Sequence, residues 1–169
     1  MSNISLEQLL RSRDERSEFQ QKLLKEWQLP LVSFTVNMPG PDKLNDRSLY
    51  IFNRGREAIK EALSDKIVFS EERELATGPE GYYIVNMDPS ELKKTTCALE
   101  DSTELGRLYD IDVIGPSGGV SREDLGLEMR RCLICGMPGA ACARNRTHSV
   151  SELIEAIDGI ISRSKGEQP

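Results

Sequence analysis

The chain has 169 residues, 38% of them apolar, which suits one domain with a packed core. Its 22 basic and 28 acidic side chains leave a net charge of -6, which excludes the large basic surface that a general DNA-binding or membrane-surface protein needs. No stretch approaches the about 18 apolar residues of a membrane span, and charged residues such as Glu7 and Arg11 stand where a signal peptide would be apolar. We therefore expect a cytoplasmic protein with one domain over residues 1–169 and a frayed tail at 165–169.

The first predicted elements are a long amphipathic helix and a strand. Apolar residues recur at helical spacing from residue 5 to residue 27, and Ser5 with Gln8 forms a capping-box pattern at the start. Residues 31–36 are mostly β-branched or apolar and are predicted as a strand.

A rigid loop and a second helix come next. The loop at 37–41 contains two prolines and a glycine, which exclude regular structure. Helical spacing of apolar residues resumes over 46–63, although Gly55 weakens this predicted helix by about 1 kcal/mol relative to alanine.

The middle of the chain predicts short strands, a turn and the start of another helix. Residues 67–69 and 82–85 are predicted as strands on either side of a turn at 77–81. The Asp-Pro pair at 88–89 matches an N-cap followed by the first position of a helix. Residues 95–99 are interpreted as strand.

The last third of the chain contains the clearest strand pattern, at residues 108–114, followed by a turn at 115–119. A short helix is expected over 121–127, then a compact irregular segment that holds most of the cysteines, then an amphipathic helix over 149–162. Together these elements predict a single-domain α+β fold with a mixed or antiparallel sheet and flanking helices.

Charge is distributed unevenly along the chain. Residues 61–104 hold eleven acidic and four basic side chains, whereas residues 129–148 hold four arginines and no acid. The four arginines are Arg130, Arg131, Arg144 and Arg146. Such a segment is either a local anion-binding site on an acidic protein or a solvated face.

Two aspartates in the strand at 108–114 form the first candidate site. Asp110 and Asp112 share one face of a strand, about 7 Å apart at the backbone, and Ile111 and Val113 face the opposite way into a core. Carboxylates this close repel each other unless they are solvated or compensated by a cation, and Mg²⁺ is the cation that prefers such ligands. The alternative is a strand with a wet outer face.

The neighbours of the pair favour phosphate chemistry. Gly106 and Arg107 precede it, a flexible point and a guanidinium that could hold a phosphate. Glu100 and Asp101 could supply a third carboxylate, as a metal ligand or a general base. These residues are typical of a metal-dependent phosphoryl or nucleotidyl transferase.

A second candidate site lies among the cysteines. Cys132, Cys135, Cys142 and His148 offer three thiolates and one imidazole, a ligand set typical of structural zinc. A dithiol redox site and simple packing of small buried cysteines remain alternatives. No aromatic residue follows Tyr109, so a nucleic-acid-binding zinc knuckle, which needs a stacking platform, is disfavoured.

Several ordered motifs resemble one known family. They are the runs LGRLYDIDV at 105–113, RCLIC at 131–135, CARNRTH at 142–148, NMPGPDK at 37–43 and TGP at 77–79. Together they resemble the CitX family, the holo-acyl-carrier-protein synthases of citrate lyase, over nearly the whole chain.

The resemblance implies an activity and a fold. It implies transfer of a 5-phosphoribosyl-dephospho-coenzyme A unit from its triphosphate donor to a serine of the citrate lyase acyl-carrier subunit, with release of pyrophosphate. It also implies a nucleotidyltransferase-like fold in which Asp110 and Asp112 hold Mg²⁺. The chain departs from the family pattern at Thr103 and Glu104, where a His-Pro pair is expected.

The resemblance and the residue pattern together suggest roles for individual side chains. Asp110, Asp112 and Arg107 are expected to be catalytic, and the four residues of the cysteine cluster to hold structural Zn²⁺. The cations expected to bind the substrate phosphates are Lys43, Arg122, Arg130 and Arg131.

Other readings of function stay open. The chain could be a non-catalytic, zinc-braced adaptor that binds an acidic partner through the arginines of 129–148, or could serve the carrier of malonate decarboxylase with the same chemistry. An acidic carrier would dock on that arginine-rich segment or near Arg47, Arg54 and Arg56. No nucleic acid or membrane partner is expected.

Overall fold

The computed structural model describes residues 4–166. At its centre lies a five-stranded sheet in the order β2-β3-β1-β4-β5, with every neighbouring pair antiparallel. The strands are β1 (Leu31–Val36), β2 (Ile67–Leu75), β3 (Gly78–Val85), β4 (Tyr109–Gly115) and β5 (Gly118–Val120). The α-helices are α1 (Leu6–Trp27), α2 (Asp46–Leu63), α3 (Pro89–Asp101), α4 (Gly139–Asn145) and α5 (Val150–Ser164). The predicted α+β class with flanking helices is confirmed, and of the two predicted kinds of sheet, mixed or antiparallel, the structure has the antiparallel one.

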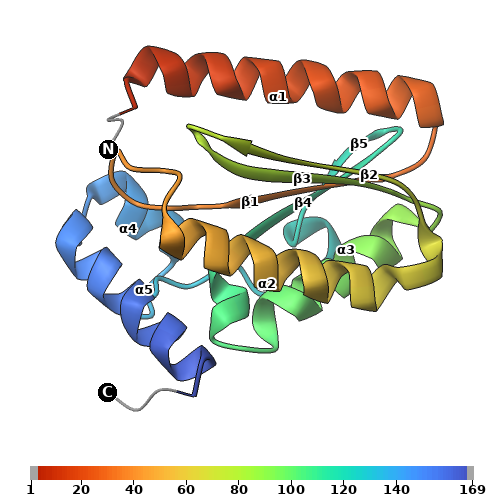
Figure 1. Cartoon of the computed structure of the whole chain (residues 1–169). Helices are drawn as coiled ribbons and strands as arrows, with labels where there is room; N and C mark the ends of the chain where they lie inside the picture. The colour runs from red at the N-terminus through yellow and green to blue at the C-terminus, as the bar shows by residue number, and fades with distance from the viewer. Residues whose placement is uncertain (1–3, 167–169) are drawn as a thin grey trace.

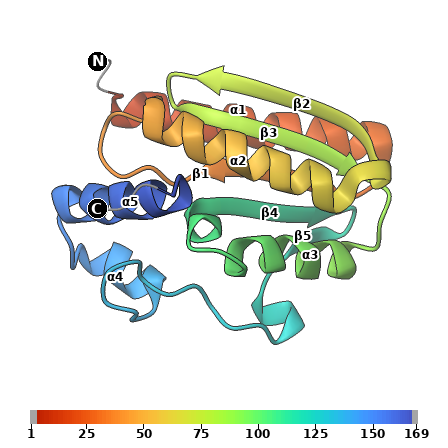
Figure 2. The same cartoon turned by 60° about the horizontal axis from the view of Figure 1, so that its bottom comes forward.

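Helices cover both faces of the sheet (Figure 1). Helix α1 lies along one face, where Leu23 packs on Leu31, Tyr82 and Ile84 of β1 and β3. Helices α2, α3 and α5 lie on the other face, as the turned view also shows (Figure 2). No helix in residues 4–166 is long and apolar enough to cross a membrane.

The larger core lies between the sheet and α2, α3 and α5. Phe34 of β1 stacks on Phe52 of α2 with ring centroids 5.0 Å apart, and Gly55 faces the same ring. A β-carbon at Gly55 would overlap the Phe34 ring, so the glycine that weakens the helix in isolation is what allows α2 to approach the sheet.

Two predictions in the middle of the chain are wrong, one of a strand and one of a turn. Residues 95–99, predicted as strand, belong to α3, where the Thr95 and Thr96 hydroxyls donate to the carbonyls of Glu91 and Lys93. Their β-branched side chains suggested a strand, but the buried residues Leu92 and Thr96 recur at helical spacing and burial decides the conformation.

The predicted turn at 77–81 is also too long. Strands β2 and β3 pair as far as Leu75 and Gly78, so only two residues lie in the turn and Pro79 is part of β3. Strand β1 pairs with β3 only as far as Glu80, so the missing N–H of Pro79 costs no hydrogen bond to β1.

The end of the chain follows the predicted order of elements. The helix expected at 121–127 is a single 3₁₀ turn, Glu123–Leu125, and the cysteine segment includes the short helix α4. Helix α5 begins after the N-cap Ser149. Of the tail predicted to fray, Lys165 and Gly166 form a turn and residues 167–169 lie outside the described part of the chain.

Candidate active site and metal cluster

The aspartate pair lies on the face of the sheet that carries α1. In the pairing of β1 with β4, Asp110 stands opposite Thr35 and Asp112 opposite Ser33. The Thr35 hydroxyl donates to Asp110 Oδ2 at 3.2 Å. Ile111 lies buried on the opposite face, so the predicted alternation along β4 is confirmed.

Helix α1 leaves this part of the sheet uncovered. Its polar side chains contact β1 and β3, where Arg16 pairs with Glu80 at 2.9 Å and Gln20 donates to Ser33 at 2.9 Å. Over β4 a cavity of about 910 Å³ remains, bounded by the segments before and within α4. The predicted site residues that line it are Asp110, Asp112, Arg107, Arg122, Arg130 and Arg131.

The two aspartates have different electrostatic surroundings. Asp112 keeps access to water through the cavity mouth, but the surrounding walls desolvate it and Asp110 repels it, and both effects raise its pKa. Asp110 has Arg130 beside it, with Nη1 3.9 Å from Oδ1. This single long contact leaves the pair of carboxylates undercompensated, which is the condition under which oxygen ligands bind a divalent cation.

Two of the arginines that line the cavity are held by backbone carbonyls. Arg130 Nη2 donates to the carbonyl of Arg107 at 2.6 Å, and Arg107 Nη2 donates to the carbonyl of Cys132 at 3.2 Å. A β-carbon at Gly106 would overlap the Leu99 carbonyl oxygen, so only glycine lets the chain pass the end of α3 at this point and deliver Arg107 to the cavity.

Glu100 closes the open edge of β4. Strand β5 pairs only with residues 113–115, so the backbone at Ile111 has no strand partner on that side. Glu100 Oε1 accepts from the Ile111 N–H at 3.0 Å, and Lys93 Nζ donates to the Ile111 carbonyl at 3.1 Å. Both side chains come from α3, two helical turns apart, and together they replace a neighbouring strand.

Arg122 forms ion pairs with Glu100 and with the next residue, Asp101. It is 7% exposed, its Nη2 lies 2.5 Å from Glu100 Oε2, and both terminal nitrogens donate to Asp101 at 3.0 Å. Glu100 and Asp101 were expected at the end of a strand as a third metal ligand or a general base. They lie instead at the end of α3, with Arg122 as their partner, and this arginine braces the cavity wall.

The predicted phosphate ligand Lys43 does not line the cavity. Its Nζ donates to the Met38 carbonyl, and burial, followed by the nearby charge of Arg13, lowers its pKa. Thr35 and Lys93, by contrast, reach the site without having been predicted. Strand pairing places Thr35 opposite Asp110, and the packing of α3 beside β4 brings in Lys93, so neither residue could be found from its distance along the sequence.

The cysteine cluster forms a compact ligand set. One ligand atom from each of Cys132, Cys135, Cys142 and His148 lies within 4.8 Å of all the others. Cys135 Sγ and Cys142 Sγ are 3.4 Å apart, and the Ile134 N–H donates to Cys132 Sγ at 3.5 Å. Zinc–sulfur bonds of about 2.3 Å place tetrahedral sulfurs about 3.8 Å apart, so these four residues could hold a metal such as zinc.

Two further observations fit a cation at the cluster. His148 Nε2 is buried and has no hydrogen-bond partner within residues 4–166. The Met137 N–H, His148 and Cys142 lower the pKa of Cys135 to about 6, so this thiol ionises readily. The hydrogen bond with the Cys135 thiolate raises the pKa of Cys142 to about 11. Both sulfurs would therefore be ionised together only next to a cation.

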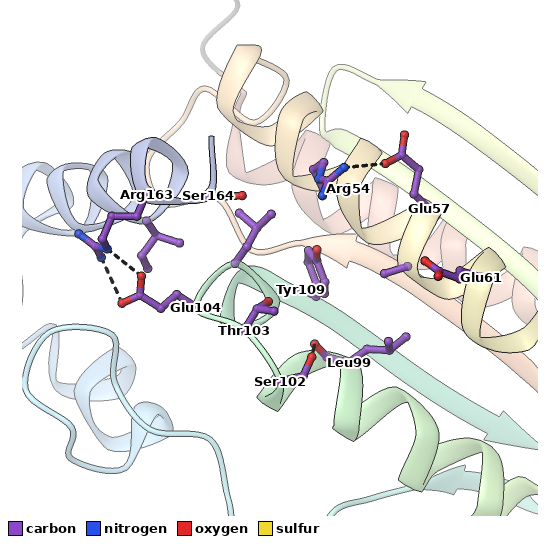
Figure 3. A pocket seen from close by; sticks show the side chains of 13 residues that line it. Arg54, Glu57, Glu61, Leu99, Ser102, Thr103, Glu104, Tyr109, Arg163 and Ser164 are labelled. Atoms are coloured by element: carbon purple, nitrogen blue, oxygen red, sulfur yellow. Dashed lines mark hydrogen bonds and ion pairs between the residues drawn. The ribbon is translucent and has the colours of Figure 1, made fainter. Parts of the chain in front are cut away.

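A further hollow of about 490 Å³ opens on the side of α2 and α5 (Figure 3). Its arginines are paired: Arg54 contacts Glu57 at 3.1 Å and Arg163 contacts Glu104 at 2.7 Å. Glu104 therefore forms an ion pair with Arg163 at a position where the family pattern has a proline. The hollow lies across the sheet from Asp110 and Asp112.

Comparison with known proteins assigns the chain to a family. The family model described as apo-citrate lyase phosphoribosyl-dephospho-CoA transferase matches residues 4–164. Curated proteins of that name from Escherichia coli O1:K1 and Shigella boydii serotype 18 are each 41% identical to this chain over 164 residues. Each alignment covers 94% of this chain and 89% of the relative. The chain belongs to the apo-citrate lyase phosphoribosyl-dephospho-CoA transferase family, to which its motifs already pointed.

Proposed function

We propose that this protein transfers the 5-phosphoribosyl-dephospho-CoA group from its triphosphate donor to a serine of the citrate lyase acyl-carrier subunit. Pyrophosphate is the second product. The relatives carry the name of this transferase activity. The observation that carries the proposal is the meeting of Asp110 and Asp112 with Arg107, Arg130 and Arg131 in one open cavity.

The carboxylate pair suits Mg²⁺, which supplies charge neutralisation at the triphosphate when bound. Asp110 and Asp112 would hold it. The Thr35 hydrogen bond to Asp110 Oδ2 fixes that carboxylate and leaves Oδ1 facing Arg130. The undercompensated charge of the pair, seen in the raised pKa of Asp112, supports this assignment.

The arginines bind and orient the phosphates. Within residues 4–166, Arg107 and Arg131 make no ion pair with a carboxylate, and Arg130 makes only long ones, at 3.6 and 3.9 Å. These three guanidiniums are free to pair with the donor. The carrier serine oxygen then attacks the α-phosphorus from the cavity mouth and its hydroxyl proton passes to water. The bond from the α-phosphorus to the bridging oxygen breaks, and the β- and γ-phosphates leave as pyrophosphate.

We infer that the cysteine cluster holds a structural Zn²⁺. Four protein ligands leave no open position for catalysis. The cluster supports the arginines directly, because Arg130 and Cys132 lie on either side of Arg131 and both are held by backbone hydrogen bonds. The Gly139 N–H donates to the Arg130 carbonyl at 3.0 Å, and the Cys132 N–H donates to the Met137 carbonyl at 2.7 Å. Metal analysis of protein purified without chelator is expected to give one zinc per chain; a content near zero would favour packing of free cysteines.

The carrier is proposed to dock on the arginine-rich segment. The other candidate face is neutralised, because Arg47 pairs with Asp158, Arg54 with Glu57 and Arg56 with Glu72. Arg144, by contrast, has no ion pair in the part of the chain that the structure describes, and it lies on α4 beside the cavity. A local basic surface of this kind can attract an acidic carrier to an acidic protein.

The direct test is incubation of the metal-loaded protein with the triphosphoribosyl-dephospho-CoA donor, Mg²⁺ and apo citrate lyase carrier. We expect the carrier to gain the mass of the prosthetic group. A carrier with its target serine changed to alanine is the control and should gain nothing. Preferential modification of a malonate decarboxylase carrier, offered in parallel, would contradict the proposed acceptor.

A further inference from the structure

A second cavity, of about 660 Å³, adjoins the proposed phosphate site. It lies between α5, the metal-cluster segment and the loop after β1, at the end of the sheet where α4 and α5 meet (Figure 2). The two cavities share four lining residues, so they lie next to each other. The shared residues are Asn37, Leu133, Gly139 and Ala143.

The walls of this cavity are chiefly aliphatic. Leu133, Leu153 and Ile157 line it, with Pro39 at the loop side, and its lining holds no Phe, Tyr or Trp. Its volume lies in the range of pockets that take small organic ligands. Continuous aliphatic walls suit a flexible chain of methylenes and amides better than a flat base, which prefers an aromatic stacking partner.

One cation stands at this cavity. Arg146 caps α4 with φ of 49°, a left-handed conformation that is uncommon outside glycine, and it lines the cavity. Within residues 4–166 it makes no ion pair with a carboxylate, and its position between Cys142 and His148 ties it to the metal cluster. Backbone strain of this kind is frequent at ligand sites.

We propose that this cavity binds the pantetheine arm of the donor, with the adjoining diphosphate next to Arg146. The inference rests on the proposed function. The donor carries a triphosphate at one end and a flexible chain of amides and methylenes at the other. The first cavity offers cations and carboxylates, the adjoining second cavity offers aliphatic walls, and Arg146 in the lining of the second cavity offers a cation for the diphosphate.

Binding of donor fragments tests the location. In protein with methyl-labelled Leu and Ile, 3′-dephospho-CoA and 4′-phosphopantetheine at millimolar concentration should each shift the methyl resonances of Leu153 and Ile157. Adenosine, which lacks a diphosphate, should leave them in place. Shifts with adenosine alone would place the adenine there, and no shift with any of the three would show that the cavity binds neither end; both results overturn the proposal.

Kinetics supply a second test. Leu153→Trp fills the cavity and should raise the donor KM by about tenfold or more with little change in kcat. Glu155→Trp, on the exposed face of the same helix, should behave as wild type. Melting temperature checks that both variants are folded.

A surface variant covers the case in which Leu153→Trp does not fold. Arg146→Ala should raise the donor KM several-fold while leaving the Mg²⁺-dependent binding of inorganic tripolyphosphate unchanged. Arg54→Ala, on the opposite side of the sheet, is the matched control. A wild-type donor KM in Arg146→Ala would contradict this inference alone, whereas absence of transfer by the wild-type protein would contradict the proposed function.

Discussion

Asp110 and Asp112 share a face of β4 but differ in what compensates their charge. Thr35 and Arg130 contact Asp110, whereas cavity walls and the charge of Asp110 surround Asp112 and raise its pKa. An acid whose pKa is raised in the folded state destabilises that state when it ionises. The cost is present at neutral pH and disappears as the pH falls below the pKa values of both states.

Asp112→Asn is therefore expected to raise the melting temperature slightly at pH 7 in the presence of a chelator, since water in the cavity mouth screens part of the repulsion. The difference between variant and wild type should shrink as the pH falls and the wild-type carboxyl gains its proton. Thermal melts between pH 4 and pH 8 measure this. A lower melting temperature for the variant at pH 7 would show that Asp112 is not under electrostatic strain.

Arg122 should be important for stability. Its partner Glu100 is 3% exposed and also holds the N–H of Ile111, so removal of the guanidinium leaves a buried carboxylate with only the more distant Arg130, 3.6 Å away, as a cation. Arg122→Met is expected to cost about 3 kcal/mol of unfolding free energy, measured by urea denaturation. Arg122→Lys keeps the charge and should lose less; equal losses in both variants would contradict the role of the charge.

The sequence predicts the residues of the site better than their partners. Period-two alternation was sufficient to place Asp110 and Asp112 on one face. The ion pairs of Arg122 with Glu100 and Asp101 could not be predicted, because they depend on the packing of α3 beside β4. Lys43 was assigned on charge alone, and the fold places it outside the cavity.

At the scale of elements, the junction between α3 and β4 sets the geometry of the cavity. Gly106 lies against the carbonyl oxygens of Leu99 and Glu100 at the end of α3, and Arg107 follows directly. The misassigned residues 95–99 lie in the same helix, where tertiary burial outweighed the strand preference of two threonines.

Gly106→Ala should destabilise the protein by about 1–3 kcal/mol, because the new β-carbon must displace backbone. It should also reduce transfer by moving Arg107. Gly119→Ala is the matched control, since a β-carbon there meets nothing within 4 Å, and its melting temperature should stay near that of wild type. Equal melting temperatures for both variants would contradict the close packing at this junction.

At the scale of the whole molecule, the net charge of -6 conceals an arginine-rich segment beside the cavity. Most of the element order and an α+β class with a mixed or antiparallel sheet followed from sequence patterns. The strand order β2-β3-β1-β4-β5 did not, because pairing between distant strands leaves no local signal. That order is what leaves β4 beyond the cover of α1 and so opens the cavity.

Docking of the carrier should depend on this local charge. Arg144→Glu is expected to raise the KM for the carrier several-fold, with the donor KM unchanged, and the effect should weaken as salt is added. Arg54→Glu, in the neutralised region, is the control and should leave the carrier KM near wild type. Equal effects of the two variants would indicate that only the net charge matters.

The central claim is that Asp110 and Asp112 carry metal-dependent transfer of the prosthetic group. The most direct measurement is the intact mass of the carrier after a single turnover with Mg²⁺, comparing the wild-type protein with the Asp110→Asn/Asp112→Asn double variant. The account predicts full modification by the wild type, none without Mg²⁺, and none by a double variant that still folds. Substantial modification by the double variant would contradict it.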